Sequence, residues 1–501
     1  MSNSIVHFIN GQKSPGTGER RQDVYNPATG EVTGSLHLGG QEDLQAAVAA
    51  AKTASTAWAD MSLSKKSAIL FSFRELVNAH ADELAAIITA EHGKVLSDAK
   101  GEVNRGLEVV EFACGIFEQL KGEYSDQVST GIDVFSFRQP LGVVAGITPF
   151  NFPVMVPLWM SPVAIATGNT FILKPSERDP SASLLLAELW KQAGLPDGVF
   201  NVLHGDKEMV DGLLTHPDVD GISFVGSTPI ARHVYETGTQ HGKRVQALGG
   251  AKNHAVIMPD ADMTMAAEHL NAAAFGSAGE RCMAISVAVA VGEAADEVVS
   301  RVKDLAAGIT VTNGADPRAD MGPVITPASK ERITRIVGEA QEAGAAVVLD
   351  GRDLVVEGHE NGFFVGPTIL DNVRQEMTAY EEEIFGPVLA VIRVDSLEEA
   401  IQVINANPYG NGTAVFTSNG AVARTFQRKV NVGMIGINVP LPVPVAWHSF
   451  GGWKNSLFGD LHIYGPDGVK FYTRGKVVTQ RWPEPTSVSG ASFAMPSTSD
   501  H

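Results

Sequence analysis

The sequence has very few cysteines and no long uninterrupted hydrophobic segment. Its 501 residues include only Cys114 and Cys282. Two cysteines cannot build a disulfide framework or a zinc–thiolate cluster, and they fit a reducing compartment. The most apolar long stretch, Phe152–Leu173, contains three prolines and a polar end. It therefore predicts a buried segment and not a membrane span, so we expect no membrane partner.

Basic charge is also scarce. Lysine and arginine total 38 against 57 acidic residues, which leaves a net charge of −19. We therefore expect no nucleic-acid partner, because binding to phosphates requires a basic face. The apolar fraction of 44% and the charged fraction of 19% exclude a mostly disordered chain and a coiled coil. The first residues lack a basic segment followed by an apolar one, so we expect no signal peptide and a cytoplasmic protein.

Several common catalytic motifs are absent. The sequence has no G-x-G-x-x-G, P-loop, H-E-x-x-H, C-x-x-C or G-x-S-x-G pattern. A standard dinucleotide fingerprint and a serine-hydrolase elbow are therefore excluded, and no metal site is predicted.

The organisation of the chain indicates two α/β domains, because 501 residues exceed what one hydrophobic core accommodates. Apolar spacing predicts helices over Gln41–Ala59, Ser64–His92 and Gly101–Leu120, with Ser64 as a cap and Gly93 as a stop. After Leu141, short apolar runs alternate with helical stretches, which is typical of a doubly wound parallel sheet. The predicted strands of this first series are Leu141–Ile147, Thr170–Leu173, Val199–Leu203, Gly221–Val225 and Ala255–Met258, with a helix at Ser181–Gln192.

A second strand–helix series from about Ser286 to Arg424 predicts a second α/β domain. Two segments, Tyr124–Phe137 and Gly468–Arg481, have the pattern of an antiparallel ribbon. The end of the chain, residues 483–501, is rich in serine, proline and threonine and is expected to be disordered.

Lys174-Pro-Ser-Glu177 directly follows a predicted strand. Ligands of open α/β sheets lie beyond the carboxyl ends of strands, and this lysine and glutamate could both hydrogen-bond a ribose diol. The glutamate would repel a 2′-phosphate and favour NAD over NADP. A solvated loop with one ion pair is the structural alternative.

Phe224-Val-Gly226-Ser227-Thr228-Pro229 also follows a predicted strand and opens a helix at Ile230–Gly238. Pro229 suits a first helical turn, which Ser227 or Thr228 could cap. A helix N-terminus beside a glycine is a candidate anion site. An ordinary capped helix explains the same pattern.

Cys282 lies among small residues and follows Arg281. Flanking glycines leave the thiol approachable, and the guanidinium favours the thiolate. A buried, inert cysteine is the alternative. Asn151, in the Thr148–Pro153 turn after a strand, could donate to an oxyanion or simply stabilise the turn. Glu381–Pro387 is either a further part of this site or a charged helix end.

The order and spacing of these motifs resemble those of the aldehyde dehydrogenase superfamily, over about Phe8–Trp482. The resemblance implies an NAD-binding domain from residues 1–122 and 140–252 with a return segment at 455–467, and a catalytic domain at 253–454. It also implies an oligomerisation ribbon at 123–139 and 468–482, a homotetramer and an atypical way of holding NAD.

The resemblance also implies roles for individual residues. Cys282 would be the nucleophile, and the Asn151 amide with the Cys282 N–H would hold the oxyanion. Glu383 and Phe385 match contacts to the nicotinamide half of NAD. The full set implied for the cofactor is Thr148, Phe150, Lys174, Glu177, Arg178, Gly226, Ser227, Gly249, Glu383 and Phe385.

Ala247 departs from the pattern of the hydrolytic members, which place a glutamate before Leu-Gly-Gly. A methyl group cannot act as a general base. The thioacyl enzyme should therefore resist water and wait for a thiol, which predicts coenzyme A as acyl acceptor.

Residues 251–254, 280–284, 459–460 and 471–473 resemble a CoA-acylating branch of the family. Its substrates are methylmalonate semialdehyde and malonate semialdehyde, and its products are propionyl-CoA or acetyl-CoA, NADH and carbon dioxide. In this branch two arginines serve the substrate carboxylate, and they match Arg105 and Arg281 here; a guanidinium can grip a carboxylate with two hydrogen bonds. A solvated helical charge and a structural ion pair are the alternatives for the two.

Two other functions remain open. One is a hydrolytic aldehyde dehydrogenase that gives a free acid, with Glu280 as a displaced general base. The other is a catalytically silent NAD-binding structural protein.

Overall fold

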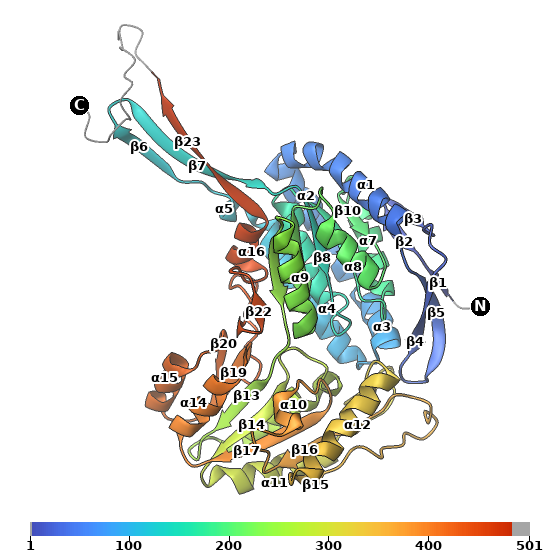
Figure 1. Cartoon of the computed structure of the whole chain (residues 1–501), viewed down its shortest axis with the longest axis vertical. Helices are drawn as coiled ribbons and strands as arrows, with labels where there is room; N and C mark the ends of the chain where they lie inside the picture. Colours follow the sequence, from blue (N-terminus) through green and yellow to red (C-terminus); the bar gives the residue numbers. More distant parts are fainter. Residues whose placement is uncertain (1–2, 483–501) are drawn as a thin grey trace.

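The computed structural model describes residues 3–482, so the tail expected to be disordered, residues 483–501, lies outside the described part. The chain forms two α/β bodies and a ribbon that extends away from them (Figure 1). Among the helices of residues 3–482, none combines the length and the apolar character needed to cross a bilayer.

The N-terminal region joins a small sheet to a layer of helices. The sheet has the order β1-β5-β4. Its strands and the helices that follow are β1 (Asn3–Ile5), β4 (Arg21–Asn26), β5 (Glu31–His37), α1 (Gln41–Asp60), α2 (Leu63–Ala79), α3 (Ala81–His92), α4 (Leu96–Cys114) and α5 (Ile116–Gln119).

Two of the predicted helices are wrong in their limits. The helix predicted over Ser64–His92 is two helices, because His80 leaves the helical region (φ −103°, ψ 15°) between α2 and α3. Ser62, not Ser64, caps α2 by accepting a hydrogen bond from the Lys65 N–H. Gly93 ends α3 with φ 94°, as predicted. The helix predicted to begin at Gly101 begins at Leu96 and stops at Cys114, where α4 ends.

The first large sheet has eight strands in the order β22-β12-β11-β8-β9-β10-β2-β3. The five from β12 to β10 are parallel, and the outer strands are antiparallel. Its strands are β2 (His7–Ile9), β3 (Gln12–Ser14), β8 (Val143–Ile147), β9 (Thr170–Lys174), β10 (Phe200–Val202), β11 (Gly221–Val225), β12 (Arg244–Leu248) and β22 (Leu457–Phe458). Its helices are α6 (Met155–Ala166), α7 (Ser181–Gln192), α8 (Lys207–Thr215) and α9 (Thr228–Gln240). Every residue of α6 is buried, so the apolar stretch is buried, as predicted, and most of it forms this helix.

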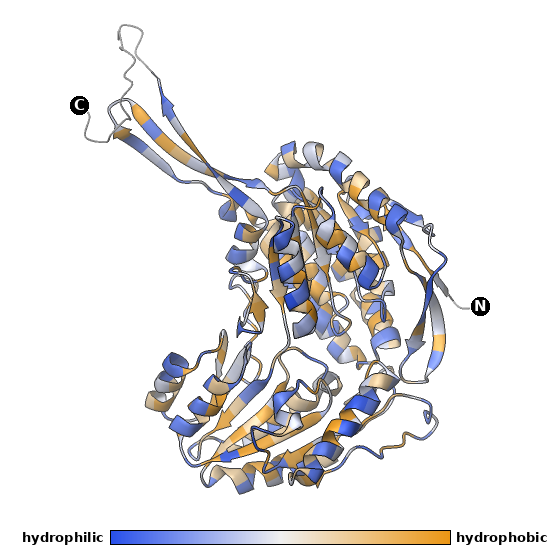
Figure 2. Cartoon of the chain, in the orientation of Figure 1, coloured by the Kyte–Doolittle hydropathy of each residue, from blue (hydrophilic) through white to orange (hydrophobic). Residues whose placement is uncertain are grey.

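The second sheet has the order β15-β16-β17-β14-β13-β19-β20 and is parallel except for β15. The two doubly wound parallel sheets confirm the predicted fold class. Hydrophobic residues dominate the central strands of this body (Figure 2), as expected where helices cover a parallel sheet. Its strands are β13 (Asn253–Ile257), β14 (Ile285–Val291), β15 (Ala346–Leu349), β16 (Thr368–Asp371), β17 (Val388–Val394), β19 (Gly412–Phe416) and β20 (Met434–Ile437). Its helices are α10 (Met263–Phe275), the 3-10 helix η1 (Gly276–Gly279), α11 (Ala294–Ala307), α12 (Pro327–Glu342), α13 (Thr378–Glu381), α14 (Leu397–Ala406) and α15 (Gly420–Lys429).

The ribbon consists of β6 (Tyr124–Ser129), β7 (Ile132–Pro140) and β23 (Thr473–Arg481) in the order β23-β7-β6. It projects from the body (Figure 1). The segment predicted as strand from Gly468 begins instead with α16 (Gly465–Phe471). The reason is that Tyr472 is fully buried against the body, so the chain can leave the body only at Thr473. A further small pair is β18 (Tyr409–Gly410) with β21 (Trp453–Lys454).

Candidate active site

The first sheet has its topological switch point between β8 and β11. The chain runs outward from β8 through β9 to β10 on one side, and from β11 to β12 on the other. Ile147, the last residue of β8, pairs with Lys174 of β9 and with Phe224 of β11. Three predicted motifs therefore follow three neighbouring strand ends at one edge of the sheet, where open α/β sheets bind ligands.

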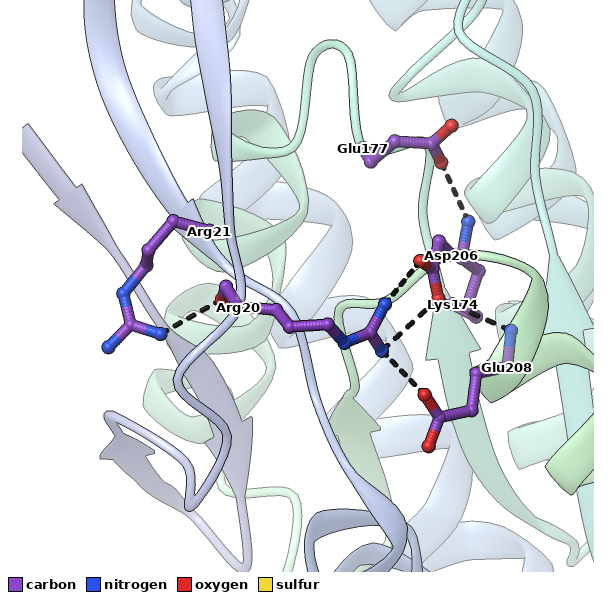
Figure 3. Close-up of polar contacts among 6 residues, drawn as sticks. All are labelled: Arg20, Arg21, Lys174, Glu177, Asp206 and Glu208. Atoms are coloured by element: carbon purple, nitrogen blue, oxygen red, sulfur yellow. Dashed lines mark hydrogen bonds and ion pairs between the residues drawn. The ribbon is translucent and has the colours of Figure 1, made fainter.

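Lys174 and Glu177 form an ion pair of 3.0 Å at the end of β9 (Figure 3). The side chain of Lys174 is 6% exposed and that of Glu177 is 35% exposed, so the glutamate faces the surface where a ligand can reach it. Burial acts to raise the pKa of Glu177, but Lys174 outweighs it and the pKa is lowered. Glu177 is therefore an anion at neutral pH.

Arg20 makes a neighbouring contact that sequence reasoning missed. Its guanidinium reaches Asp206 at 2.5 Å and Glu208 at 2.8 Å, where α8 begins (Figure 3). This contact ties the segment before β4 to the edge of the sheet that carries Lys174 and Glu177. No local pattern could have found it, because Arg20 lies 186 residues before Asp206.

The N-terminus of α9 follows β11 and is open. Ser227 occupies the cap position, but within the described chain its side chain makes no capping hydrogen bond. Thr228 does not cap either, since its Oγ1 accepts the Gly250 N–H at 2.8 Å. The predicted hydroxyl cap is therefore wrong. The uncapped N–H groups of the first turn are suited to a phosphate.

Glycines bring backbone close to this helix end. A Cβ on Gly226 would lie 2.5 Å from the Phe224 ring, and one on Gly249 would lie 2.7 Å from the Asn455 carbonyl. Both positions therefore require glycine. The residues present fit a dinucleotide: an uncapped helix end for its phosphates and the Lys174–Glu177 pair for its ribose.

Cys282 lies in a cavity that is also lined by Arg281, Glu383 and Phe385. The carbonyl of Cys282 accepts hydrogen bonds from the side-chain amides of Asn253 at 2.8 Å and Asn411 at 3.1 Å. Burial and the neighbouring Glu383 raise the pKa of the Cys282 thiol to about 12. The thiol of the free protein is therefore protonated at neutral pH.

Glu383 is held from two sides. Its Oε1 accepts the Ala251 N–H at 2.9 Å, and Arg332 donates to its backbone carbonyl at 2.9 Å. Burial raises the pKa of this carboxyl, although Ala251 and nearby cations oppose the shift. Phe385 has a left-handed φ of 52°, a strained conformation typical of functional sites.

The turn after β8 reaches the second body through Phe150, whose ring meets the Phe385 ring edge-on at 5.8 Å. The exposed Arg178 guanidinium lies over the Phe150 ring, 5.1 Å from the ring centre. Thr148 donates its N–H to the Lys174 carbonyl at 3.1 Å. The turn therefore connects the edge of the first sheet to the Cys282 cavity.

Asn151 is 3% exposed. Its carbonyl accepts a hydrogen bond from Lys94 Nζ at 2.6 Å, whereas its side-chain amide donates to no other residue within 3–482. Cys282 packs against the same hydrophobic cluster as Phe152, the next residue of the turn. The Asn151 amide is therefore an unused donor in a buried turn, and the turn packs on the same hydrophobic cluster as Cys282.

The two candidate substrate arginines have different surroundings. Arg281 lines the Cys282 cavity and donates to Asp98 at 2.6 Å. Burial acts to raise the pKa of Asp98, but Arg281 and Lys94 lower it, so the pair is ionic. The remaining N–H donors of the Arg281 guanidinium make no hydrogen bond within the described chain.

Arg105 is not among the cavity residues. It pairs with Glu108 at 2.7 Å and donates to the Pro444 carbonyl at 2.9 Å. Tyr464 donates to the same carbonyl at 3.0 Å. Arg105 therefore lies outside the cavity that Arg281 and Cys282 line.

Glu280, the alternative general base, is completely buried. Its Oε1 accepts the Ile325 N–H at 3.3 Å, and its Oε2 lies 3.8 Å from His92 Nε2. Burial raises the pKa of Glu280 to about 8. Glu280 is therefore largely protonated at neutral pH and does not line the cavity over Cys282.

Comparisons with known proteins identify the family. The model of the aldehyde dehydrogenase family matches residues 14–478. The chain belongs to the aldehyde dehydrogenase family. The family resemblance of the sequence is thereby confirmed.

Relatives of this aldehyde dehydrogenase include the malonate-semialdehyde dehydrogenase of Pseudomonas aeruginosa, 56% identical over 99% of each chain. The acylating methylmalonate-semialdehyde/malonate-semialdehyde dehydrogenase of rat mitochondria is 48% identical over 98% of this chain and 92% of its own. Among solved structures, the methylmalonate-semialdehyde dehydrogenase of Oceanimonas doudoroffii superposes with a TM-score of 0.95 at 56% identity, covering 97% of this chain and 99% of that one. A Sinorhizobium meliloti protein in complex with NAD superposes with a TM-score of 0.96 at 50% identity, covering 97% and 99%.

Several residues that shape the site of this aldehyde dehydrogenase escaped sequence reasoning. Asn253 lies in a stretch that the sequence singled out, but nothing local indicates that it holds the Cys282 carbonyl. Asn411, Arg332, Lys94 and Glu102 carry no motif at all. Residues 3–482 contain no group of three or more His, Cys, Asp or Glu side chains placed to hold a metal ion.

Proposed function

We propose that this enzyme oxidises malonate semialdehyde and methylmalonate semialdehyde with NAD, and transfers the acyl group to coenzyme A with loss of carbon dioxide. The products are acetyl-CoA and propionyl-CoA. The observation that carries the proposal is the set of side chains that line the Cys282 cavity: a guanidinium that can bind a carboxylate, and one carboxylate, Glu383, which already accepts the Ala251 N–H.

Cys282 is the nucleophile in this proposal. Its Sγ adds to the aldehyde carbon, and the oxyanion of the resulting thiohemiacetal is held by the Asn151 amide and the Cys282 N–H. NAD supplies the acceptor for the hydride, which leaves an acyl group on Cys282 as a thioester. Because burial keeps the free thiol protonated, attack requires cations beside it, and Arg281 is one that the chain itself provides.

The cofactor is held, in this proposal, at the carboxyl edge of the first sheet. Lys174 and Glu177 bind the adenosine ribose, and the anionic Glu177 disfavours a 2′-phosphate. Gly226 and Ser227 at the start of α9 bind the pyrophosphate, with Gly249 allowing close approach. Glu383 and Phe385 contact the nicotinamide end, while Thr148, Phe150 and Arg178 supply the remaining contacts. The Sinorhizobium meliloti relative, solved in complex with NAD, supports NAD as the cofactor.

Coenzyme A is the proposed acyl acceptor because each candidate general base that could activate water is missing or already engaged. Ala247, where hydrolytic relatives carry a glutamate, is buried in an apolar cluster within β12. Glu280 is protonated and faces His92, and Glu383 is bound by Ala251. The thioester therefore persists until a thiolate attacks it. The relatives named as acylating enzymes support the same conclusion.

The substrate carboxylate is assigned to Arg281, with Arg105 as a second contact. Arg281 lines the same cavity as Cys282, and we therefore assign to it the carboxylate of an aldehyde whose carbonyl is attacked by Cys282. Loss of carbon dioxide needs no additional group, since the thioester carbonyl of a β-carboxyl thioester accepts the electron pair.

The test is a turnover experiment with purified enzyme, NAD and malonate semialdehyde, with and without coenzyme A. The proposal expects a single burst of NADH, about one per site, without coenzyme A, and sustained turnover to acetyl-CoA with it. Equal sustained turnover to a free acid without coenzyme A would show that water is activated, and Glu383 would then be the first residue to examine. A protein that binds NAD without any burst would be catalytically silent.

We also propose that the ribbon mediates self-association to a homotetramer. It projects from the body (Figure 1) and carries exposed apolar side chains, among them Val128 and Val477. Light scattering on the purified protein measures the mass directly. Substituting Val477 by Lys should lower it if the ribbon is the contact.

A further inference from the structure

A buried ion pair lies behind the turn that carries Asn151. Lys94, just after α3, and Glu102, on α4, meet at 2.8 Å, and both side chains are 0% exposed. Burying two charges costs free energy that their attraction often fails to recover, and such pairs can be replaced by apolar residues without loss of stability. The pair therefore calls for an explanation other than stability.

All the remaining hydrogen bonds of the two side chains go to one segment. Lys94 Nζ donates to the Asn151 carbonyl at 2.6 Å and lies 4.3 Å from the centre of the Phe152 ring. Glu102 Oε1 accepts the N–H groups of Val154 at 2.8 Å and Met155 at 3.1 Å, where α6 begins. The pair thus holds the segment at Asn151 and again three and four residues later.

The support beneath the pair is rigid. Glu102 lies on α4, and α4 packs directly on α6: a Cβ on Gly106 would lie 2.7 Å from Leu158 Cδ1. The turn therefore cannot shift relative to α4 without breaking the contacts of Glu102. The pair therefore contributes to the position of the turn through contacts that the turn's own sequence does not supply.

We propose that Lys94 and Glu102 are positioning residues that orient the Asn151 side-chain amide toward the oxyanion formed at Cys282. This inference rests on the proposed function, in which Asn151 donates to that oxyanion. Lys94 fixes the backbone of Asn151, and Glu102 fixes the start of α6, so the backbone that carries the amide is held in place. A misplacement of about 1 Å in such a donor can cost a hundredfold in rate.

The experiment compares the rate of the NADH burst with malonate semialdehyde in four variants. Lys94→Met/Glu102→Gln removes both charges together, which avoids leaving either one buried alone. The same pair of substitutions is also made in an Asn151→Ala background, alongside Asn151→Ala itself. The matched control is Lys243→Met, which removes another buried lysine whose ammonium donates to two backbone carbonyls, those of His216 and Val219, at the opposite edge of the sheet.

We expect Lys94→Met/Glu102→Gln to slow the burst about 10- to 100-fold, and Asn151→Ala to slow it about 100-fold or more. In the Asn151→Ala background the pair should cost less than about threefold, because there is no amide left to orient. Lys243→Met should stay within about twofold. Alkylation of Cys282 by iodoacetamide should stay within about twofold in every variant, which shows that the cavity is intact.

Two results would overturn the inference. One is an equal slowing by the pair with and without Asn151, which would make its role purely structural. The other is an unchanged burst in the pair variant while Asn151→Ala is slow. An unchanged burst in Asn151→Ala would instead refute the proposed oxyanion role, and the inference with it. If the double variant does not fold, Glu102→Gln alone retains the acceptor for both N–H groups, and a slowing of about 3- to 10-fold is expected.

Discussion

Replacing Arg281 by glutamine tests whether the guanidinium beside Cys282 selects an anionic aldehyde. Arg281 lines the cavity and gives one donor to Asp98, which leaves other donors for a ligand. The variant should lose activity toward malonate semialdehyde and keep activity toward propanal, which has no carboxylate. The discriminating quantity is the ratio of the two kcat/KM values.

The magnitude follows from the contact that is removed. A hydrogen bond to a charged group contributes about 1.5–3 kcal/mol, and about 1.4 kcal/mol corresponds to a factor of ten. The Arg281 side chain is 19% exposed, so solvent screens the charge only in part. The ratio of kcat/KM values should therefore fall by about 10- to 150-fold, and Arg105→Gln should change it less because Arg105 lies outside the cavity.

The control is Asp98→Asn/Arg281→Gln. Arg281→Gln alone leaves Asp98 without its partner and should destabilise the protein in urea unfolding, whereas the double variant should recover that stability. Both should show the same loss of preference for the anionic aldehyde. Equal losses toward malonate semialdehyde and propanal would refute the assignment and would make Arg281 a structural residue.

Three further predictions concern groups around the thiol. The rate at which iodoacetamide alkylates Cys282 in the free protein should rise about tenfold per pH unit from pH 7 to 10, because a thiol with a pKa of about 12 has little thiolate in that range. The rate is measured as that of the wild type minus that of Cys282→Ser. A plateau below pH 9 would contradict this prediction. Glu280 has a folded pKa of about 8, above its unfolded value of 4.5, so the folded state holds a proton that the unfolded state has lost. The wild type should therefore lose stability relative to Glu280→Gln by about 1.4 kcal/mol per pH unit as the pH rises from about 5 to 8. Urea-unfolding stabilities that run parallel for the two proteins across that range would disprove this prediction. Asn253→Ala removes the donor to the Cys282 and Ala284 carbonyls, and should lower stability by about 1–3 kcal/mol and slow the burst about tenfold. Asn405→Ala, which removes exposed hydrogen bonds between α14 and the Lys429 carbonyl and Asn431 N–H, should leave the burst unchanged.

Local patterns in the sequence predict some elements to the residue. The helix Ser181–Gln192 and the strand Gly221–Val225 have the predicted limits. Apolar spacing determines these limits because each element buries one face, or both faces, against its neighbours. The limits fail where a capping contact decides: Ser62 caps α2 in place of Ser64, and the buried Tyr472 delays the ribbon strand to Thr473.

Motif order predicts more about the site than any single motif does. Thr148, Lys174 and Gly226 each follow a predicted strand, and the parallel sheet brings the ends of those strands to one edge. Parallel pairing makes this outcome predictable, because successive strands all end at the same side of the sheet. The roles assigned to these residues remain predictions.

The sequence by itself determined the α/β class, the order of the site motifs and the methyl group at Ala247, since each is read from residue type and local spacing. Only the tertiary structure paired Arg281 with Asp98, left Arg105 outside the Cys282 cavity, buried Glu280 against His92, and set Lys94 and Glu102 behind Asn151. Those contacts join residues far apart in the chain. They depend on how α4 packs on α6 and how the two bodies meet, and no local periodicity carries that information.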